Sequence, residues 1–410
     1  ATSVNGLSDA LVEDNSLYLG NDPSGTTSTA SYNVAVGINA LDAITTGDFN
    51  IAIGYAALTA NTTGSGNTAS GWEALEANTT GQSNVAIGSL SLTANTTGSW
   101  NTAVGYGSLT ANTTGNSNTA SGIAALYANT TGNYNTASGY HALYANTTGA
   151  RNIAVGHGAL DAPDTENDNL AIGYDALGGS IAGGEYNIAI GNYALDALTT
   201  GNNNVAVGYN ALTANTTGAS NTASGTNSLY ANTTGASNTA SGYYSLFTNT
   251  TGNNNTASGS LSLYSNTTGS QNTASGYQSL NANTTGNFNT ASGYISLYSN
   301  TTGGSNTAFG YRSLLSNTTG TRNIAMGIGA LDAPDTENDN LAIGYDALGG
   351  AIAGGEYNVA IGNYSLDAAT SGDNNTATGY DALTGNTTGA DNTALGYDAG
   401  DVITTGSQNV

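Results

Sequence analysis

The sequence predicts an all-β fold, a parallel β-solenoid or β-roll built from coils of 17 residues. The pentapeptide Asn-x-Ala-x-Gly recurs at that spacing from Asn33 onward, and only two repeats are longer. Its second and fourth residues, often β-branched, flank a small residue, an alternation typical of a short strand. The 410 residues include 58 glycines but only 4 phenylalanines, 2 tryptophans and 1 methionine, too few bulky side chains for one globular core. Stacked repeats that cover one another can order such a chain.

Residues 1–32 precede the repeats and are predicted to form an N-terminal cap or connector, with a degenerate first coil at 15–20. Residues 33–410 comprise 22 repeats, and the repeats at 169–186 and 340–357 contain 18 residues. Asn409 begins one more repeat, so we expect the natural polypeptide to be longer at its C-terminal end.

Each repeat is expected to form one coil with two short strands and two corners. Glycine at repeat positions 5 and 15 suits a positive φ or a close backbone approach. The Asn-Thr-Thr-Gly segment that closes 14 repeats is typical of a turn. Stacking aligns identical side chains, so the asparagine at position 1 is expected to form an amide ladder and the leucine at position 9 an inner ladder. Representative ladder residues are Asn118, Ala120, Gly122 and Leu126 in one repeat and Asn135, Ala137, Gly139 and Leu143 in the next.

The interior predicted for each coil is thin. One buried leucine contributes roughly 2 kcal/mol, which must offset the conformational entropy lost by all the residues of the coil. We therefore expect chains to associate, with the residues at positions 2 and 4 as candidates for the contact.

An acidic corner occurs twice, in the repeats that begin at Asn152 and Asn323, where the Asn-Thr-Thr-Gly turn is absent. Two interpretations are open: a solvated loop, which we favour, or a Ca²⁺ site, because Ca²⁺ takes oxygen ligands from closely spaced carboxylates. The spacing matches neither an EF-hand nor the nonapeptide of calcium-binding β-rolls. The candidate ligands are Asp161, Asp164, Glu166 and Asp168 in the first copy and Asp332, Asp335, Glu337 and Asp339 in the second. No other cofactor is expected.

The charge balance excludes several function classes. Three arginines, no lysine and 27 acidic residues give a formal charge of −24, so no basic stripe exists that could neutralise nucleic-acid phosphates. No segment approaches the length of a membrane helix, and we expect no membrane insertion. The chain has no cysteine, and His141 and His157 occupy different repeat positions, so no nucleophile and base can be paired. We do not expect an enzyme.

Tyrosine is the most frequent aromatic residue, and its placement is regular. Of the 25 tyrosines, twelve fall at repeat position 6 and five at position 10, which predicts columns of rings along the solenoid. Packing within these columns accounts for the tyrosines without a ligand. The alternative is recognition of sugars, because an exposed ring with a hydroxyl group suits a glycan.

The motifs Asn-Val-Ala-Ile-Gly at 84–88, Asn-Ile-Ala-Ile-Gly at 50–54 and Asn-Ile-Ala-Val-Gly at 152–156 resemble the head repeats of trimeric autotransporter adhesins. That resemblance covers residues 33–410 and implies a left-handed parallel β-roll of three identical chains, although the repeat here is longer. The longer pattern Asn-Thr-Ala-Ser-Gly-Tyr-x-Ser-Leu-Tyr-x-Asn-Thr-Thr-Gly is similar to repeats of tail-fibre-like proteins of marine phages, as is the entry segment 7–20.

These resemblances imply a structural and adhesive fibre outside the cell, either on a virion or, alternatively, on a bacterial surface as an adhesin head. The implied partners are identical chains in a homotrimer and a glycan or protein of a host or cell surface. A second alternative is ice binding, because eight repeats carry Thr-Ala-Ser in the strand and a flat array of threonines is one route to that activity.

Overall fold

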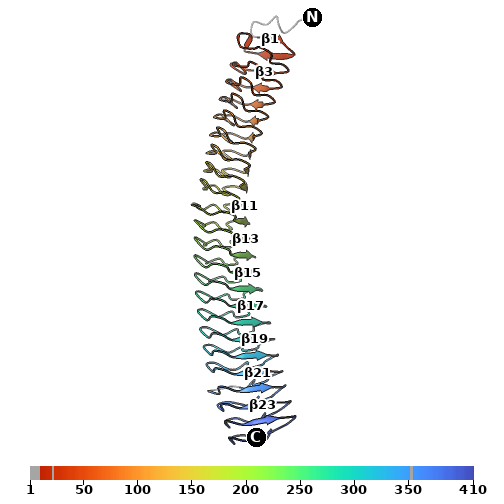
Figure 1. The fold of residues 1–410 in the computed structure, drawn as a ribbon, viewed down its shortest axis with the longest axis vertical. Coiled ribbons are helices and arrows are strands. Elements are labelled where there is room, and N and C mark those ends of the chain that lie inside the picture. The colour runs from red at the N-terminus through yellow and green to blue at the C-terminus, as the bar shows by residue number, and fades with distance from the viewer. Residues whose placement is uncertain (1–9, 21–22, 351–353) are drawn as a thin grey trace. The chain divides into compact units, whose positions relative to one another are not determined.

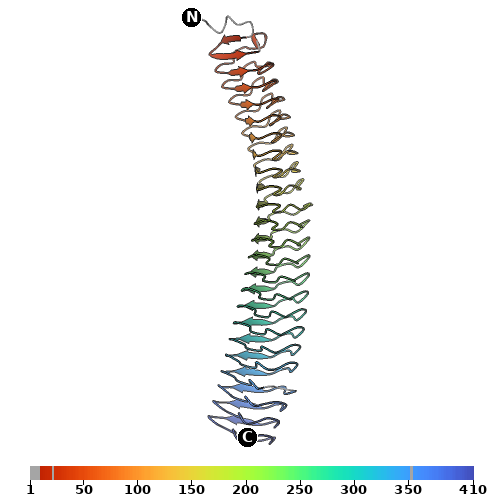
Figure 2. The same cartoon turned by 180° about the vertical axis from the view of Figure 1, so that it is seen from behind.

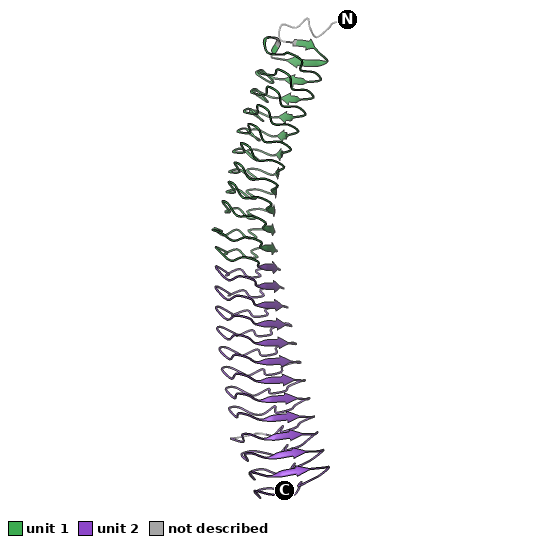
Figure 3. Cartoon of the chain, in the orientation of Figure 1, with its two compact units in different colours: residues 1–203 green, residues 204–410 purple. Residues whose placement is uncertain are grey.

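The computed structural model describes residues 10–20, 23–350 and 354–410, in two compact units, residues 1–203 and 204–410 (Figure 3). Segments 1–9, 21–22 and 351–353 lie outside the described residues. They include part of the predicted cap and part of the second 18-residue repeat.

Both units are built from stacked coils, and the expectation of an all-β parallel solenoid is confirmed. The described residues contain no α-helix, and one 3₁₀ turn, η2, spans Pro23–Gly25. Within each unit the strands stack along one side of the coils and the wider turns along the other (Figures 1 and 2). Successive strands pair in parallel and in register, so that Thr119 lies beside Thr136 and Ala120 beside Ala137.

The first described elements of the N-terminal unit form a hairpin in which β1 pairs antiparallel with β2, and from β2 onward the pairing is parallel. Its strands are β1 (Ala10–Glu13), β2 (Ser16–Leu19), β3 (Val34–Val36), β4 (Ile51–Ile53), β5 (Thr68–Ser70), β6 (Val85–Ile87), β7 (Thr102–Val104), β8 (Thr119–Ser121), β9 (Thr136–Ser138), β10 (Ile153–Val155), β11 (Leu170–Ile172) and β12 (Ile188–Ile190).

The C-terminal unit is parallel throughout. Its strands are β13 (Val205–Val207), β14 (Thr222–Ser224), β15 (Thr239–Ser241), β16 (Thr256–Ser258), β17 (Thr273–Ser275), β18 (Thr290–Ser292), β19 (Thr307–Phe309), β20 (Ile324–Met326), β21 (Leu341–Ile343), β22 (Val359–Ile361), β23 (Thr376–Thr378) and β24 (Thr393–Leu395).

In the described residues of every coil between Asn33 and Gln408 there is one strand, of three residues, so the expectation of two strands per coil is wrong. The rest of the coil bends because positions 7, 9 and 17 adopt left-handed backbone conformations, as at Ala124 (φ 55°), Leu126 (φ 53°) and Tyr134 (φ 60°). Extended strands do not contain such residues. Backbone bonding between coils nevertheless continues outside the strands, for example from the N–H of Leu126 to the carbonyl of Ala142 at 3.0 Å.

The core of a coil is narrow, as the small residues predict. Ala120 and Leu126 have no exposed surface, and the same holds for the equivalent residues of most coils. A Cβ on Gly122 (φ 141°) would lie 2.4 Å from the carbonyl oxygen of Gly139 in the next coil. A Cβ on Gly132, at position 15, would lie 2.4 Å from the oxygen of Gly149. Both glycines are therefore required by close contact between neighbouring coils.

Two ladders of buried asparagines run beside this core. The position-1 ladder is confirmed: the backbone N–H of Asn135 donates to Oδ1 of Asn118 at 3.0 Å, and Nδ2 of Asn118 donates to Oδ1 of Asn101 at 3.2 Å. A second ladder, absent from the sequence-based expectation, is formed by the asparagine of Asn-Thr-Thr-Gly. Here Nδ2 of Asn129 donates to Oδ1 of Asn112 at 2.8 Å.

The first ladder begins inside the described part of residues 1–32. Strand β2 pairs with β3, so that Leu17 lies beside Val34. Ser16 takes the place of an asparagine, and its Oγ accepts the backbone N–H of Asn33 at 2.9 Å. A short hydroxyl side chain thus completes the N-terminal end of the amide ladder.

Candidate functional site

The acidic corner of the coil that begins at Asn152 separates its carboxylates instead of gathering them. Glu166 points inward and is 4% exposed. Its Oε2 accepts the backbone N–H groups of Asp164 and Thr165 at 2.9 and 3.0 Å, and its Oε1 accepts that of Gly183 at 2.8 Å. Three backbone donors thus satisfy this carboxylate, and Glu166 stabilises the loop in place of the missing asparagine turn.

The other carboxylates of the corner have separate partners. Asp164 accepts a hydrogen bond from the hydroxyl of Thr147 in the preceding coil. Asp168 forms a bidentate ion pair with Arg151, with Nε to Oδ1 at 2.6 Å and Nη2 to Oδ2 at 2.7 Å. The hydrogen bond from the Arg151 guanidinium holds the pKa of Asp168 below its ordinary value. Asp161 interacts with neither Glu166 nor Arg151, and its first charged neighbour is Asp175 of the next coil.

The second copy repeats this arrangement. Glu337 accepts the backbone N–H groups of Asp335, Thr336 and Gly354, at 2.8, 2.9 and 2.8 Å. Arg322 pairs with Asp339, with Nε to Oδ1 at 2.6 Å. Asp335 accepts a hydrogen bond from Thr318. Among the residues that the structure describes, no three His, Asp or Glu side chains lie close enough together to hold a metal ion. The Ca²⁺ site stays a prediction.

A different grouping of aspartates, not expected from the sequence, forms around the glycines of the long coil. Burial, followed by repulsion from Asp175, raises the pKa of Asp161. Burial also raises the pKa of Asp196, with Asp175 and Asp161 adding to the shift. The second copy differs at Asp332, where burial raises the pKa but Arg312, with Nη2 3.6 Å from Oδ2, opposes the rise. The sequence does contain a signal for this grouping: Asp161 and Asp196 occupy position 10 of their coils, and Asp175 occupies position 7 of the coil between them.

The aromatic residues form the expected columns. At position 6 the rings of Tyr277, Tyr294 and Tyr311 stack with centroids 5.3 and 5.5 Å apart. At position 10 Tyr127 stacks on Tyr144 at 5.2 Å. Because the rings in a column lie face to face, their faces are covered, and mainly their edges and hydroxyl groups remain for a ligand.

The two histidines also pack against tyrosine rings, but only His157 belongs to the position-6 column. His157 stacks between Tyr140 and Tyr174, at centroid distances of 5.1 and 5.0 Å. His141 stacks on Tyr140 at 3.9 Å. The Nδ1 atom of His157 lies 3.9 Å from Oδ1 of Asp175. Ring packing accounts for the position of both side chains.

The outer face of the strands is the remaining candidate surface. Positions 2 and 4 point outward, and Ile51 and Ile53 are 41% and 45% exposed. In the C-terminal unit five consecutive strands, β14 to β18, instead carry threonine and serine at these positions. The same face thus alternates between apolar and hydroxyl-bearing stretches.

No helix among the described residues is long and apolar enough to cross a membrane. Comparison of the chain with protein-family models and with curated proteins finds no match.

Proposed function

We propose that this chain is a segment of an extracellular fibre, a repetitive structural shaft whose surface attaches to a glycan or protein of a host or cell surface, and that it performs no catalysis. One observation carries the proposal: the nearly invariant residues at positions 1, 3 and 9 are buried in most coils, whereas the residues at positions 6 and 17, which differ from coil to coil, are mostly exposed. Asn135, Ala137 and Leu143 have no exposed surface, whereas Tyr140 and Tyr134, at positions that vary between coils, are 45% and 65% exposed. Such a scaffold displays different side chains at fixed spacing, which suits attachment better than catalysis.

A homotrimer is part of this proposal. The interior of each coil holds little more than one leucine and small residues, while apolar side chains at positions 2 and 4 remain exposed. Burying these side chains against identical chains would add the apolar contact that a single chain lacks. The adhesin-like motifs favour three chains and a left-handed roll.

The proposed location is a virion surface, where the chain would be part of a tail-fibre-like shaft. The alternative is a bacterial cell surface, where it would belong to an adhesin head. Antibodies against residues 33–410 are expected to label intact virions, or unpermeabilised cells of the source, in electron micrographs. Labelling only after permeabilisation would contradict an extracellular fibre. Whether virions or cell walls carry the label decides between the two locations.

Ice binding is a second candidate because of the hydroxyl-bearing strands β14 to β18. Their in-register pairing, for example Thr239 beside Thr256 and Ser241 beside Ser258, places identical hydroxyl groups in two rows. This stretch is the observation that favours the candidate, and the test is given in the Discussion.

A further inference from the structure

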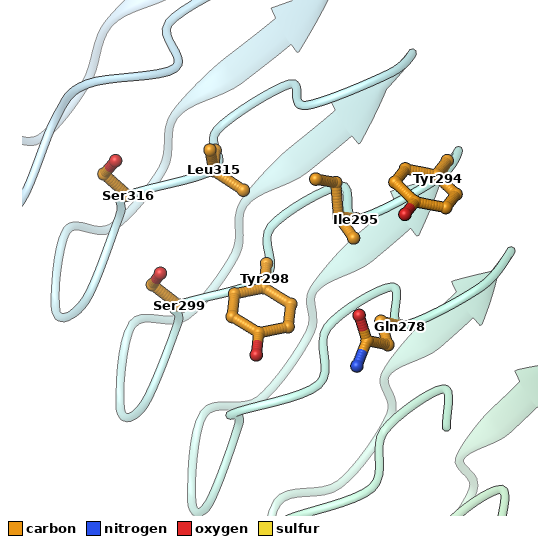
Figure 4. Close-up of a pocket in the computed structure, with 7 residues that line it drawn as sticks. All are labelled: Gln278, Tyr294, Ile295, Tyr298, Ser299, Leu315 and Ser316. Carbon is orange, nitrogen blue, oxygen red and sulfur yellow. The ribbon is translucent and has the colours of Figure 1, made fainter. Parts of the chain in front are cut away.

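An open recess of about 400 Å³ lies in the C-terminal unit, where three consecutive coils present their variable residues (Figure 4). Tyr298 and Leu315 come from position 10 of two neighbouring coils, and Gln278 comes from position 7 of the coil before them. Tyr294 and Ile295 complete the apolar part of the lining. The volume is in the range of pockets that hold small molecules.

A side-chain hydrogen bond that links neighbouring coils elsewhere is missing at the recess. In several other coils a threonine or asparagine at position 10 donates to the carbonyl of position 7 in the preceding coil. Thr110 donates in this way to the carbonyl of Leu90 at 3.1 Å, and Asn281 to that of Leu261 at 2.9 Å. Tyr298 makes no such bond.

The replacement leaves acceptors without a partner. Tyr298 and Leu315 stand where that donor would be, and the carbonyl oxygens of Gln278 and Ile295 accept no hydrogen bond from any described residue. The side-chain amide of Gln278 likewise makes no hydrogen bond within the described ranges. The recess thus offers both donors and acceptors to a ligand.

Tyr298 differs from the other aromatic residues at position 10. Tyr127 stacks on Tyr144, and Phe247 stacks between Tyr230 and Tyr264. Tyr298 lies between Asn281 and Leu315 in its column and contacts no other ring in the described part of the chain. No aromatic neighbour covers its ring faces.

We propose that this recess binds a neutral sugar of the surface glycan to which the fibre attaches. A tyrosine ring that stacks on no other ring, next to amide and hydroxyl groups, matches the apolar C–H face and the hydroxyl groups of a pyranose ring. Ser299 and Ser316 add hydroxyl groups to the lining, which contains no charged side chain. Because the protein carries a formal charge of −24, a neutral sugar is favoured over an anionic one.

The inference rests on the proposed attachment function but is tested separately from it. Saturation-transfer NMR on the full chain would use four probes: maltose, cellobiose, lactose and N,N′-diacetylchitobiose. We expect transfer to at least one of them, reduced at least tenfold by Tyr298→Thr. Threonine occupies position 10 in other coils, including Thr110, so the coil can accommodate it. The matched control is Tyr264→Thr, which removes a stacked tyrosine from the same column and should leave the transfer within twofold of the unaltered chain.

A second variant guards against a folding defect. Gln278→Leu preserves the size of the side chain but removes its amide, and it is expected to weaken the transfer at least tenfold with an unchanged circular dichroism spectrum. Absence of transfer to all four probes, or equal transfer in Tyr298→Thr and the unaltered chain, overturns the sugar site. Antibody labelling of virions or cells would then still support the fibre, whereas sugar binding without surface labelling would retain the recess and reject the fibre.

Discussion

The side-chain amide of Asn129 donates to Oδ1 of Asn112, 17 residues earlier, at 2.8 Å. In the next coil Asn146 donates to Oδ1 of Asn129 at the same distance. Each amide is therefore a donor in one direction along the solenoid and an acceptor in the other. Because these amides are buried, each of them needs the amides of the neighbouring coils as hydrogen-bond partners.

Removal of one ladder amide is expected to destabilise the N-terminal unit. Asn129→Ala leaves Oδ1 of Asn112 without its donor and Nδ2 of Asn146 without one of its acceptors, at a cost of about 2 to 4 kcal/mol. Thermal unfolding followed by circular dichroism measures the loss. The control is Thr131→Ala, because Thr131 lies on the same turn with an exposed side chain and should change the melting temperature little. Equal effects of the two substitutions would contradict the role of the ladder.

A methyl group at position 15 is expected to separate two coils. In Gly132→Ala the new Cβ would lie 2.4 Å from Oδ1 of Asn129 and from the oxygen of Gly149, so the backbone must shift, at a cost of about 2 kcal/mol or more. Gly25→Ala is the matched control, because nothing lies within 4 Å of its added Cβ. Denaturant unfolding compares them, and a Gly132→Ala variant as stable as the control would refute the close packing.

The fold could be predicted because its period is in the sequence. A fixed spacing sets the register, and register sets which side chains stack, so the asparagine ladder of Asn118 and the leucine ladder of Leu126 follow directly. The left-handed backbone at Leu126 could not be foreseen, because propensity disfavours leucine there and only contacts with neighbouring coils override it. The residue types of the Asn-Thr-Thr-Gly segment indicate an ordinary turn. Contacts between coils, which local sequence does not reveal, make its asparagine a buried ladder residue.

The candidate site was less predictable. Asp161, Asp164 and Glu166 are close in sequence, so they were candidate ligands of a single site. In the structure Glu166 instead points inward and accepts three backbone N–H groups. The partners of Asp161 are aspartates one and two coils away. Their proximity depends on the register between coils at the 18-residue repeat, which local spacing does not reveal.

Neutralising Asp161 is expected to stabilise the chain near neutral pH. Its raised pKa means that the folded state binds the proton more tightly than the unfolded state, so stability falls as the pH rises from the ordinary aspartate value near 3.9 through the raised pKa. Asp161→Asn removes the cost of burying the charged carboxylate, and then the repulsion from Asp175, and should raise the melting temperature at neutral pH by about 1 to 2 °C. The gain should disappear in acid, where the aspartate is protonated.

The control for this prediction is a substitution that should change the melting temperature at neutral pH in the opposite direction. The pKa of Asp168 is lowered by Arg151, so its contribution to stability is present above the ordinary aspartate pKa and is lost as the pH falls through the lowered value. Asp168→Asn should therefore lower the melting temperature at neutral pH. If both substitutions shift it in the same direction, the assignment of these two environments is wrong.

The outer strand face is expected to mediate trimer formation. Sedimentation of the unaltered chain should give three times the chain mass of 40.6 kDa. The double substitution Ile51→Lys and Ile53→Lys places like charges in the proposed contact. The protein concentration at which half of the trimer has dissociated should therefore rise at least about tenfold. Ile38→Lys, at an exposed position outside the strand, is the control. A folded monomer in the unaltered chain at micromolar concentration would reject the trimer.

Thermal hysteresis is expected to be absent. The hydroxyl rows of β14 to β18 combine threonine with serine, and the strands on either side carry Val205 and Phe309 in the same rows. A lattice match to ice would be limited to five coils. Nanolitre osmometry on concentrated protein measures the freezing-point gap directly. A gap that disappears when Thr256 is replaced by leucine would establish ice binding instead.

The oxygen Oδ1 of Asn146 is one of two buried side-chain polar atoms that have no hydrogen-bond partner in the described part of the chain. Its ladder stops there because Pro163, which has no amide to offer, stands at the equivalent position of the next coil. In the C-terminal unit the Oδ1 of Asn317, which precedes Pro334, accepts only a bond of 3.5 Å from Asn323. An array of nearest-neighbour contacts yields at its weakest junction. We therefore expect that, under tension, the coils separate beside Pro163 and Pro334 before they separate where the asparagine ladder is uninterrupted.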